Sequence, residues 1–284
     1  MTTTTTTTTT TTKGRMPVLF VGHGSPMNAL QDNRFTRQWQ AIGAAVPAPR
    51  AIVVISAHWL TDGTFVTANA QPKTIHDFGG FPRALFEVQY PARGDPGLAK
   101  TIAALLDRGA AGLSEDWGLD HGTWSVLAHT HPLSPSSSSS SASSSGAGVP
   151  VLQVSIDPRL PPARHTEIGA SLAPLRDQGV LLIGSGNVTH NLRRVDMSAG
   201  ASDVATAPWA GRFDADVAQA LGARDVAFLQ RALETDDGRQ SHPSNDHWLP
   251  LLYAQGASAA DDAVSFPVTG FDLGSFSMRS ARFG

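Results

Sequence analysis

The first two thirds of the chain contain four short apolar runs in which hydrophobic and polar residues do not alternate. They are residues 16–21 (MPVLFV), 51–56 (AIVVIS), 149–156 (VPVLQVSI) and 180–183 (VLLI). Short, continuous runs of this kind are typical of strands buried on both faces of a parallel sheet. The C-terminal region returns to a strand-like pattern at residues 264–268 and 275–282.

Between these runs the apolar residues recur at the spacing of a helix. Residues 34–45 carry Phe35, Trp39 and Ile42 three or four positions apart, so these side chains share one face. Similar patterns cover residues 96–108, 164–177, 209–221 and 225–233. Strands that alternate with helices predict an α/β fold, in which a central, mostly parallel or mixed sheet carries helices on both faces.

Two low-complexity stretches fall outside this pattern. Residues 2–12 are all Thr, and residues 134–148 contain only Ser, Ala, Gly and Pro. Neither stretch has the side chains to form a core. We expect a disordered tail over residues 1–15 and a single catalytic domain over residues 16–284, with residues 134–148 as an inserted surface loop. A linker between two domains is the alternative for that insertion.

Composition and charge exclude several classes of protein. The chain has 284 residues, and its 21 Lys and Arg against 24 Asp and Glu give a net charge of −3, which argues against a nucleic-acid binder. Cys is absent, so disulfides, thiolate metal sites and a Cys nucleophile are excluded. No apolar run reaches the ~20 residues of a membrane helix, and the Thr run lacks the features of a targeting peptide. We therefore expect a cytoplasmic protein without nucleic-acid or membrane partners.

Three of the apolar runs lead within a few residues into a histidine. These are His23 in VGHGSP, His58 in ISAHW and His190 in IGSGNVTH. Ligands of α/β sheets bind at the edge where the carboxyl ends of the strands lie. One histidine after a strand is usually a polar loop residue, but three at the same edge make a metal site an equally good interpretation. Without Cys, such a site depends on imidazole and carboxylate.

A fourth candidate ligand is His247, in the segment HPSNDHWLP. Ser244 or Asn245 is expected to cap a short helix that carries it. On such a helix Asp246 and His247 point about 100° apart, so we do not expect both to bind one ion. A histidine on the helix surface is the alternative for His247, and His242 is a weaker ligand candidate.

The other histidines carry less information. His121 lies between small residues in WGLDHGTW, which permit close approach of a ligand, and Asp120 is either an orienting carboxylate or a helix cap. His76, in IHDFGGFP, lines a pocket or belongs to a structural loop. Three histidines have the surroundings of surface residues: His129, His131 and His165.

No other catalytic motif is complete in this sequence. The GxSxG nucleophile elbow, the GxGxxG dinucleotide fingerprint, the Walker A phosphate loop and the HExxH zinc motif are all absent. Metal chemistry on histidines is what remains.

Taken together, six ordered motifs resemble the class III extradiol ring-cleavage dioxygenases, and among them the DOPA 4,5-dioxygenase branch. The motifs are GHGSPM at 22–27, SAHW at 56–59, IHDFGGFP at 75–82, WGLDHG at 117–122, GSGNVTHNL at 184–192 and DHWLPLL at 246–252. The resemblance extends from about residue 16 to residue 284, interrupted by the Ser-rich tract. Its motifs identify the family, but they say much less about which substrate the protein uses.

The resemblance implies an α/β fold with a non-haem metal at the carboxyl edge of the sheet. Matched motif by motif, His23, His58 and His247 correspond to metal ligands. His190 corresponds to a fourth ligand or to the acid/base, and His121 to a residue that handles dioxygen or the substrate hydroxyl. Many class III members use two histidines and one carboxylate, whereas here the third position is His247. The implied metal is Fe(II) for the chemistry or Zn(II) in the protein as isolated.

The expected function is therefore to open the ring of a catechol such as DOPA next to its two hydroxyls, with dioxygen as co-substrate. The implied partner is a small catechol, and the chain is expected to be a monomer or small homo-oligomer. A zinc-dependent hydrolase that uses the same histidines is the alternative, and a metal-binding protein without activity is a third hypothesis. The sequence leaves open the physiological catechol, the 4,5 or 2,3 cleavage position and the native metal.

Overall fold

A computed structural model describes residues 14–133, 148–196 and 206–284 of the chain. Nearly all of the expected Thr-rich tail (residues 1–13) and of the Ser-rich insertion (residues 134–147) lies outside the described residues.

The described chain is built on one eight-stranded sheet with the order β4-β3-β5-β2-β6-β1-β10-β7. The strands of this sheet are β1 (Val18–Gly22), β2 (Ala51–Leu60), β3 (Phe65–Thr67), β4 (Gly112–Ser114), β5 (Val151–Ile156), β6 (Val180–Gly186), β7 (Val264–Val268) and β10 (Ser280–Phe283). The central strands β5, β2, β6 and β1 are parallel, whereas β10 and β7 add antiparallel pairs at one edge and β3 pairs antiparallel with β5. The predicted mostly parallel α/β sheet is confirmed.

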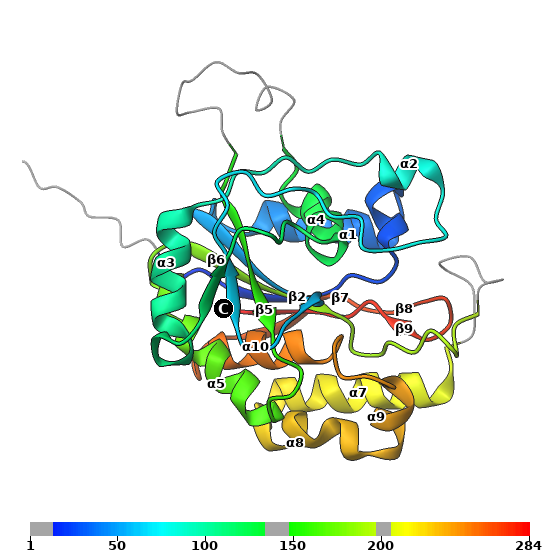
Figure 1. Ribbon diagram of the computed structural model, residues 1–284. Coiled ribbons are helices and arrows are strands. Elements are labelled where there is room, and N and C mark those ends of the chain that lie inside the picture. Colours follow the sequence, from blue (N-terminus) through cyan, green and yellow to red (C-terminus); the bar gives the residue numbers. More distant parts are fainter. Residues whose placement is uncertain (1–13, 134–147, 197–205) are drawn as a thin grey trace, which may run out of the picture.

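Helices cover both faces of the sheet (Figure 1). They are α1 (Arg34–Ala45), α2 (Arg83–Phe86), α3 (Pro96–Leu105), α4 (His121–Thr130), α5 (Pro162–Leu172), α6 (Pro174–Asp177), α7 (Pro208–Ala223), α8 (Val226–Arg231), α9 (Asp236–Ser241) and α10 (Leu249–Ala257), with the 3-10 turns η1 (Pro26–Leu30), η2 (Leu106–Gly109) and η4 (Ala232–Glu234). Helices α1 and α4 pack on one face, and α5, α7, α8 and α10 lie on the other. The fold therefore has three layers.

Two hydrophobic cores follow from the alternation of side chains along the buried strands. In β1, Val18 and Phe20 point into the core beneath α5 and α10, whereas Leu19 and Val21 point into the core beneath α1 and α4. Because both sets are apolar, the strand reads as a continuous hydrophobic run in the sequence. This is why the run of residues 16–21 predicts a strand in the interior of the sheet.

Two elements that the sequence predicts as continuous are interrupted in the structure. The predicted helix over residues 164–177 is two helices, α5 and α6, which meet at Pro174; its ring removes the backbone N–H that a continuous helix needs. The predicted strand over residues 275–282 is also interrupted. Its first part is β9 (Phe276–Ser277), which pairs with β8 (Phe271–Asp272) in a separate hairpin, and its second part is β10 in the main sheet.

Arg176 joins three segments inside the protein. Its side chain is 1% exposed, and its guanidinium donates to the carbonyl oxygens of Met16 (2.7 Å) and Ala257 (3.1 Å) and pairs with Asp262 at 2.7 Å. It thereby connects the start of β1, the end of α10 and the turn before β7. Removing one partner of a buried ion pair leaves the other charge without compensation.

We expect Arg176→Met to lower the free energy of unfolding by about 3–5 kcal/mol, as is usual when a buried pair loses one partner. Urea denaturation of the purified variant measures this. The matched control is Arg83→Met, because Arg83 and Glu87 form an ion pair whose side chains are 92% and 60% exposed. Similar losses of stability in the two variants would contradict the structural role of Arg176.

Candidate metal centre and catechol pocket

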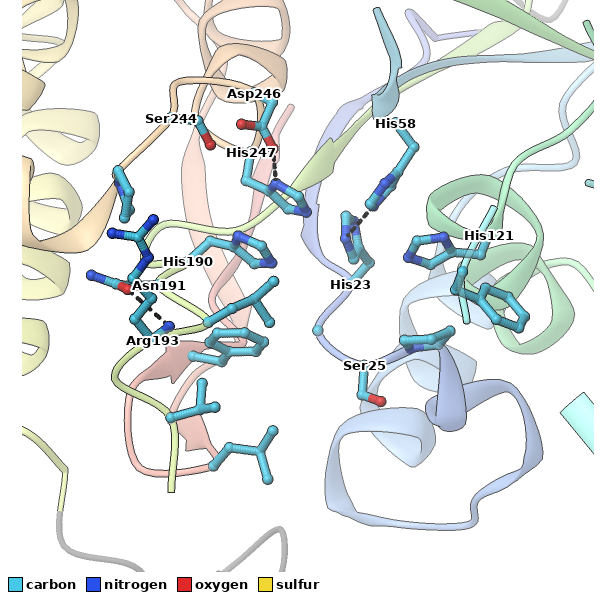
Figure 2. A pocket seen from close by; sticks show the side chains of 18 of the residues that line it. His23, Ser25, His58, His121, His190, Asn191, Arg193, Ser244, Asp246 and His247 are labelled. Carbon is cyan, nitrogen blue, oxygen red and sulfur yellow. Dashed lines mark hydrogen bonds and ion pairs between the residues drawn. The ribbon is translucent and has the colours of Figure 1, made fainter. Parts of the chain in front are cut away.

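Five histidines from distant parts of the chain meet at the carboxyl edge of the sheet (Figure 2). They are His23 directly after β1, His58 near the end of β2, His121 at the start of α4, His190 after β6 and His247 before α10. The ring centroids of His23, His58 and His247 form a triangle with sides of 5.1, 5.1 and 4.9 Å. The structure thus brings together all the histidines that the sequence analysis selected for this site.

One ring nitrogen of His23 is held by a hydroxyl group. His23 Nδ1 lies 3.0 Å from Ser185 Oγ, and that hydroxyl donates its own proton to the Gly122 carbonyl oxygen at 2.6 Å. The hydroxyl oxygen is therefore an acceptor for His23, which places the imidazole proton on Nδ1. The lone pair of His23 Nε2 faces the centre.

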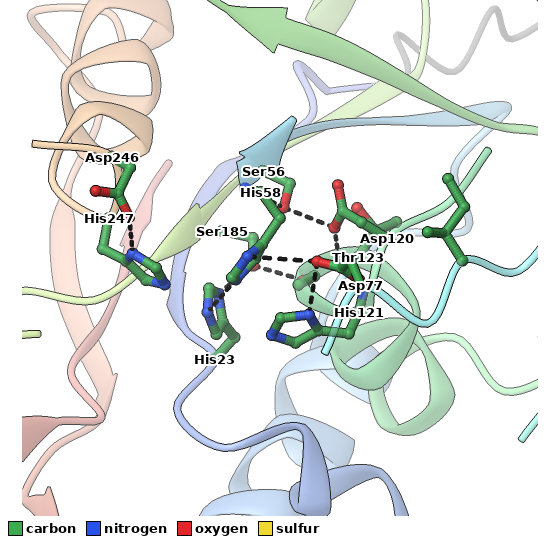
Figure 3. Close-up of polar contacts among 12 residues, drawn as sticks. His23, Ser56, His58, Asp77, Asp120, His121, Thr123, Ser185, Asp246 and His247 are labelled. Carbon is green, nitrogen blue, oxygen red and sulfur yellow. Dashed lines mark hydrogen bonds and ion pairs between the residues drawn. The ribbon is translucent and has the colours of Figure 1, made fainter. Parts of the chain in front are cut away.

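In His58 and His247 a carboxylate lies beside the corresponding nitrogen, Nδ1 (Figure 3). His58 Nδ1 lies 3.4 Å from Asp77 Oδ2, and His247 Nδ1 bonds to the Asp246 carboxylate. Histidines that bind metals usually donate their second N–H to a carboxylate or another acceptor, which fixes the tautomer and the ring orientation. A proton on Nδ1 of each ring faces an acceptor and leaves a free lone pair on Nε2.

These Nε2 atoms fit a single metal ion. His23 Nε2 and His58 Nε2 are 3.2 Å apart, and His247 Nε2 is buried without a hydrogen-bond partner among the described residues. Two metal–nitrogen bonds of about 2.0–2.1 Å that meet at roughly 90–110° place their nitrogens about 2.9–3.4 Å apart. Two facing lone pairs repel each other unless a cation lies beside both. The donor set therefore matches a metal ion held by three imidazoles.

Two other groups of side chains are close enough to hold a cation, namely His58 with Asp77 and His121, and His190 with Asp246 and His247. In both groups the carboxylate already accepts a hydrogen bond from a histidine Nδ1. In the group of His23, His58 and His247, by contrast, the Nε2 atoms that face one another are free to bind a metal ion.

Burial keeps these imidazoles neutral. Desolvation, with a smaller effect from the neighbouring imidazoles, lowers the pKa of His23 and of His247 well below the usual value. Burial, followed by the influence of His121, lowers the pKa of His58 to about 3. Neutral imidazole is the form that binds a metal, so the ligands need no deprotonation at neutral pH.

The turn before α10 corrects one prediction. The sequence predicted a helix through His247 with Asp246 pointing elsewhere, but α10 begins at Leu249 and the preceding residues form turns. In this turn the Asp246 carboxylate reaches the His247 ring. Gly186 lets the turn approach the end of β6, because a Cβ there would lie 2.2 Å from the His247 carbonyl oxygen.

His190 lies beside His247 with its ring in parallel contact. The two ring centroids are 3.4 Å apart, and Phe276 stacks on His190 at 4.8 Å. Burial lowers the pKa of His190 to about 4, so this imidazole is also neutral at neutral pH. No described residue hydrogen-bonds to its ring nitrogens, which leaves them available to an ion or to a bound molecule.

His121 is the first residue of α4, and the Asp120 side chain caps that helix by accepting the Thr123 backbone N–H at 3.1 Å. Of the two roles considered for Asp120, the helix cap is the one observed. The His121 ring centroid is 3.8 Å from that of His58 and 5.7 Å from that of His23. It lies on the side of the centre opposite His190 (Figure 2).

The remaining histidines have structural contacts. His76 Nε2 bonds to the Val88 carbonyl oxygen at 3.0 Å, and His242 Nε2 to that of Val188 at 2.8 Å. The prediction that His165 lies on the surface is wrong, because it is fully buried between the Tyr253 hydroxyl and the Leu160 carbonyl oxygen. The same prediction fails in part for His129 and His131, which are half-buried.

A cavity of about 480 Å³ opens beside the histidines. Apolar side chains form most of its wall, including Phe78, Phe81, Leu192, Leu273 and Phe276. Cavities of this size with few polar groups are typical of small-molecule sites. An aromatic ring next to the imidazoles is the kind of ligand that this wall accommodates.

Sequence reasoning missed the groups that orient the ligands. Asp77 follows His76 in the IHDFGGFP motif, and Ser185 lies within GSGNVTHNL, but in both motifs only the histidine was considered. An acidic residue next to a candidate histidine is the one signal that would have pointed to Asp77.

Comparison with known proteins agrees with this geometry. A family model described as the catalytic LigB subunit of aromatic ring-opening dioxygenase matches residues 17–283. The chain is 45% identical over 274 residues to the 4,5-DOPA dioxygenase extradiol of Escherichia coli K12, covering 95% of each chain. It is 34% identical over 272 residues to the protein of the same name from Beta vulgaris, covering 93% of this chain and 95% of the relative.

A solved structure supports the same assignment. The crystal structure of an uncharacterized Escherichia coli K12 protein matches with a TM-score of 0.78 at 41% identity, covering 95% of this chain and 100% of the other. The chain therefore belongs to the LigB family of non-haem metal-dependent enzymes. Within it, this protein is an extradiol ring-cleavage dioxygenase. Within the described residues, no helix combines the length and the apolar character needed to cross a membrane.

Proposed function

We propose that this enzyme opens the ring of a catechol with a carboxylate-bearing side chain, such as DOPA, next to its two hydroxyls, with dioxygen as co-substrate. His23, His58 and His247 are the metal ligands. The observation that carries this proposal is the convergence of three imidazoles, each with an acceptor oxygen beside Nδ1. The names of the relatives in Escherichia coli and Beta vulgaris support DOPA as the substrate.

Iron and zinc both suit an all-imidazole site, but they differ in chemistry. A bound Fe(II) supplies the electron transfer that a reaction with dioxygen needs, whereas Zn(II) has no redox chemistry. We therefore assign Fe(II) to the active enzyme, and we expect Zn(II) in protein isolated without added iron.

The chain's own residues bind and orient the catechol. Phe78, Phe81 and Phe276 pack against its ring within the cavity. His190, neutral and without a hydrogen-bond partner among the described residues, accepts a phenolic proton or serves as a fourth ligand. His121 faces the centre from the other side and bonds to the second oxygen or to dioxygen.

Arg193 supports a substrate with a carboxylate. Among the described residues that line the cavity it is the single Lys or Arg, and its guanidinium has no ion pair within the described parts of the chain. It lies on the His190 side of the cavity, three positions further along the chain (Figure 2). Most of the remaining exposed wall is apolar, and Arg193 is its one fixed positive charge among the described lining residues, so this cation is the group that favours an acidic side chain over a neutral or basic one.

The experiment that tests the proposed function is reconstitution of metal-free protein with Fe(II) under anaerobic conditions, followed by exposure to dioxygen. We expect oxygen uptake and a new ring-opened absorbance with DOPA, and weaker signals with caffeate and protocatechuate. The same protein loaded with Zn(II) is expected to show neither signal. Ester or amide hydrolysis by the zinc form, without oxygen uptake by the iron form, would instead establish the alternative of a zinc hydrolase.

Substitution of Arg193 tests the substrate class. Arg193→Met is expected to raise the KM for DOPA by about 10-fold, the lower end of the roughly 1.5–3 kcal/mol that a hydrogen bond to a charged group contributes. The KM for dopamine, which has the same catechol and no carboxylate, should stay unchanged. Arg194→Met is the matched control, because Arg194 does not line the cavity. Equal effects of Arg193→Met on both substrates would contradict carboxylate recognition.

Three further properties remain proposals. The single-domain organisation over residues 16–284 is supported by the family match over residues 17–283. A cytoplasmic location and a monomeric or small homo-oligomeric state are kept as expectations from the sequence.

A further inference from the structure

Asp77 contacts two of the five histidines at once (Figure 3). Its Oδ2 lies 2.9 Å from His121 Nδ1 and 3.4 Å from His58 Nδ1, and its Oδ1 accepts the His121 backbone N–H at 2.9 Å. The Asp77 side chain is 16% exposed, against 20% for His58 and 7% for His121. One carboxylate oxygen is thus shared between a proposed metal ligand and a proposed catalytic residue.

The loop that carries Asp77 is fixed by contacts of its own. Thr74 and Leu119 form a parallel bridge, and the Ile75 backbone N–H donates to the Leu119 carbonyl oxygen at 2.7 Å. The Trp124 indole donates to the Ile75 carbonyl oxygen at 2.8 Å. The backbone before Asp77 is therefore tied to the segment that begins α4, which sets where the carboxylate lies.

A carboxylate accepts hydrogen bonds and donates none when it is ionised. Oδ2 lies beside both Nδ1 atoms, so it favours the tautomer in which each neutral imidazole has its single proton on Nδ1 and its lone pair on Nε2. For His58 that lone pair faces His23 Nε2 at 3.2 Å, at the proposed metal position. For His121 it remains available as an acceptor at the centre.

We propose that Asp77 is a positioning residue that holds His58 and His121 in the same tautomer, so that the metal ligand and the catalytic histidine are oriented by one carboxylate. The proposal rests on the proposed function, which assigns these two roles. Asp77 is not one of the three proposed ligands, and it does not line the cavity.

A general role in folding is a weaker explanation for these contacts. Helix α4 is capped by Asp120, which also accepts hydrogen bonds from Ser56 Oγ at 2.7 Å and from Gln153 Nε2 at 2.6 Å. This buried network holds the start of α4 without Asp77. Replacement of Asp77 is therefore expected to leave the helix in place and to affect the two rings.

Asp77→Asn is the variant that tests the proposal, because the amide keeps the shape of the carboxylate and replaces one acceptor by a donor. If the amide NH2 faces the two Nδ1 atoms, it opposes their N–H groups; if it faces the His121 backbone N–H, that bond is lost. We expect metal affinity to fall about 10- to 100-fold, as for other groups that orient metal ligands. We expect kcat to fall with it, while the KM for DOPA changes little.

The control is Asp95→Asn, at the N-cap of α3 and far from the histidines. The Asp95 side chain accepts the Leu98 backbone N–H, and Asn is an equally good residue at that position. This variant should keep the metal affinity and the turnover of the unchanged protein. Thermal unfolding of both variants shows whether either has lost its fold.

A second measurement needs no variant at Asp77. Nitrogen-15 NMR of the metal-free protein reports which ring nitrogen of each neutral histidine carries the proton, with signals assigned by His58→Gln and His121→Gln. We expect Nδ1–H for both residues, and loss of that tautomer from at least one of them in Asp77→Asn. A proton on Nε2 rather than Nδ1 of either His58 or His121 in the unchanged protein would overturn the proposal.

The two proposals fail in different ways. If the iron-loaded protein cleaves catechols while Asp77→Asn retains full metal affinity and kcat, the role of Asp77 is wrong and the proposed function stands. If the iron-loaded protein consumes no oxygen, the proposed function is wrong, and the tautomer and metal-affinity data still decide whether Asp77 orients the two rings.

Discussion

Alanine in place of His23 is expected to abolish metal binding and catechol-dependent oxygen uptake together. His23 is in contact with both other proposed ligands, with its Nε2 3.2 Å from His58 Nε2 and its ring 5.1 Å from that of His247. Without it, two of the three proposed ligands remain to hold the ion. The loss of metal affinity should exceed the roughly 10- to 100-fold effect of removing a group that merely orients a ligand.

Metal analysis by mass spectrometry after iron loading, paired with oxygen-electrode kinetics, measures both effects on one sample. His131→Gln is the matched control, because His131 is half-buried and bonds to the neighbouring Thr130 hydroxyl, away from the centre. It should bind as much iron as the unchanged protein. A His23→Ala protein with full iron content would refute the three-imidazole site.

The proposed ligands differ in what holds them, and this has a chemical consequence. His247 bonds at Nδ1 to the Asp246 carboxylate, and His58 Nδ1 lies 3.4 Å from Asp77 Oδ2, whereas His23 bonds to the Ser185 hydroxyl. A carboxylate partner makes an imidazole a stronger electron donor than a hydroxyl partner does. Two of the three proposed ligands thus have a negative charge beside Nδ1.

The positions of the histidines were predictable from the sequence because parallel strands impose a simple rule. The runs before His23 and His58 are apolar on both faces, which identifies interior strands, and the ends of such strands meet at one edge. Side chains that follow those strands therefore gather, whatever the details of the loops. The same reasoning located His190.

The orienting groups were not predictable, because they depend on the path of loops and turns. Asp77 reaches His121 through a loop whose course is set by pairing with residues more than forty positions away. Asp246 reaches His247 because α10 starts at Leu249, three or four residues later than a helix capped by Ser244 or Asn245 would start. His165 is buried because α5 packs on α10. The polar residues at the start of α5 gave no sign of this tertiary contact in the sequence.

His190→Gln is expected to reduce turnover by roughly 10²- to 10⁴-fold, the usual contribution of a general acid or base. Glutamine keeps a polar side chain against His247 and Phe276, so the wall of the cavity should persist. If His190 acts on protons alone, the variant should bind nearly as much iron as the unchanged protein. If it is a fourth ligand, iron content and turnover should fall together.

His121→Ala tests whether His121, on the side of the centre opposite His190, acts in the reaction without binding the metal. Asp77 remains beside His58 when the His121 ring is removed, so the ligand keeps its partner and the iron content should stay close to that of the unchanged protein. Turnover should fall, with some of the oxygen consumed released as hydrogen peroxide because substrate and dioxygen are no longer held together. Oxygen uptake with and without catalase measures that fraction.

Unchanged turnover in both His190→Gln and His121→Ala would show that neither residue takes part in the reaction. The proposed metal site of His23, His58 and His247 would be unaffected by that result, because it rests on its own geometry.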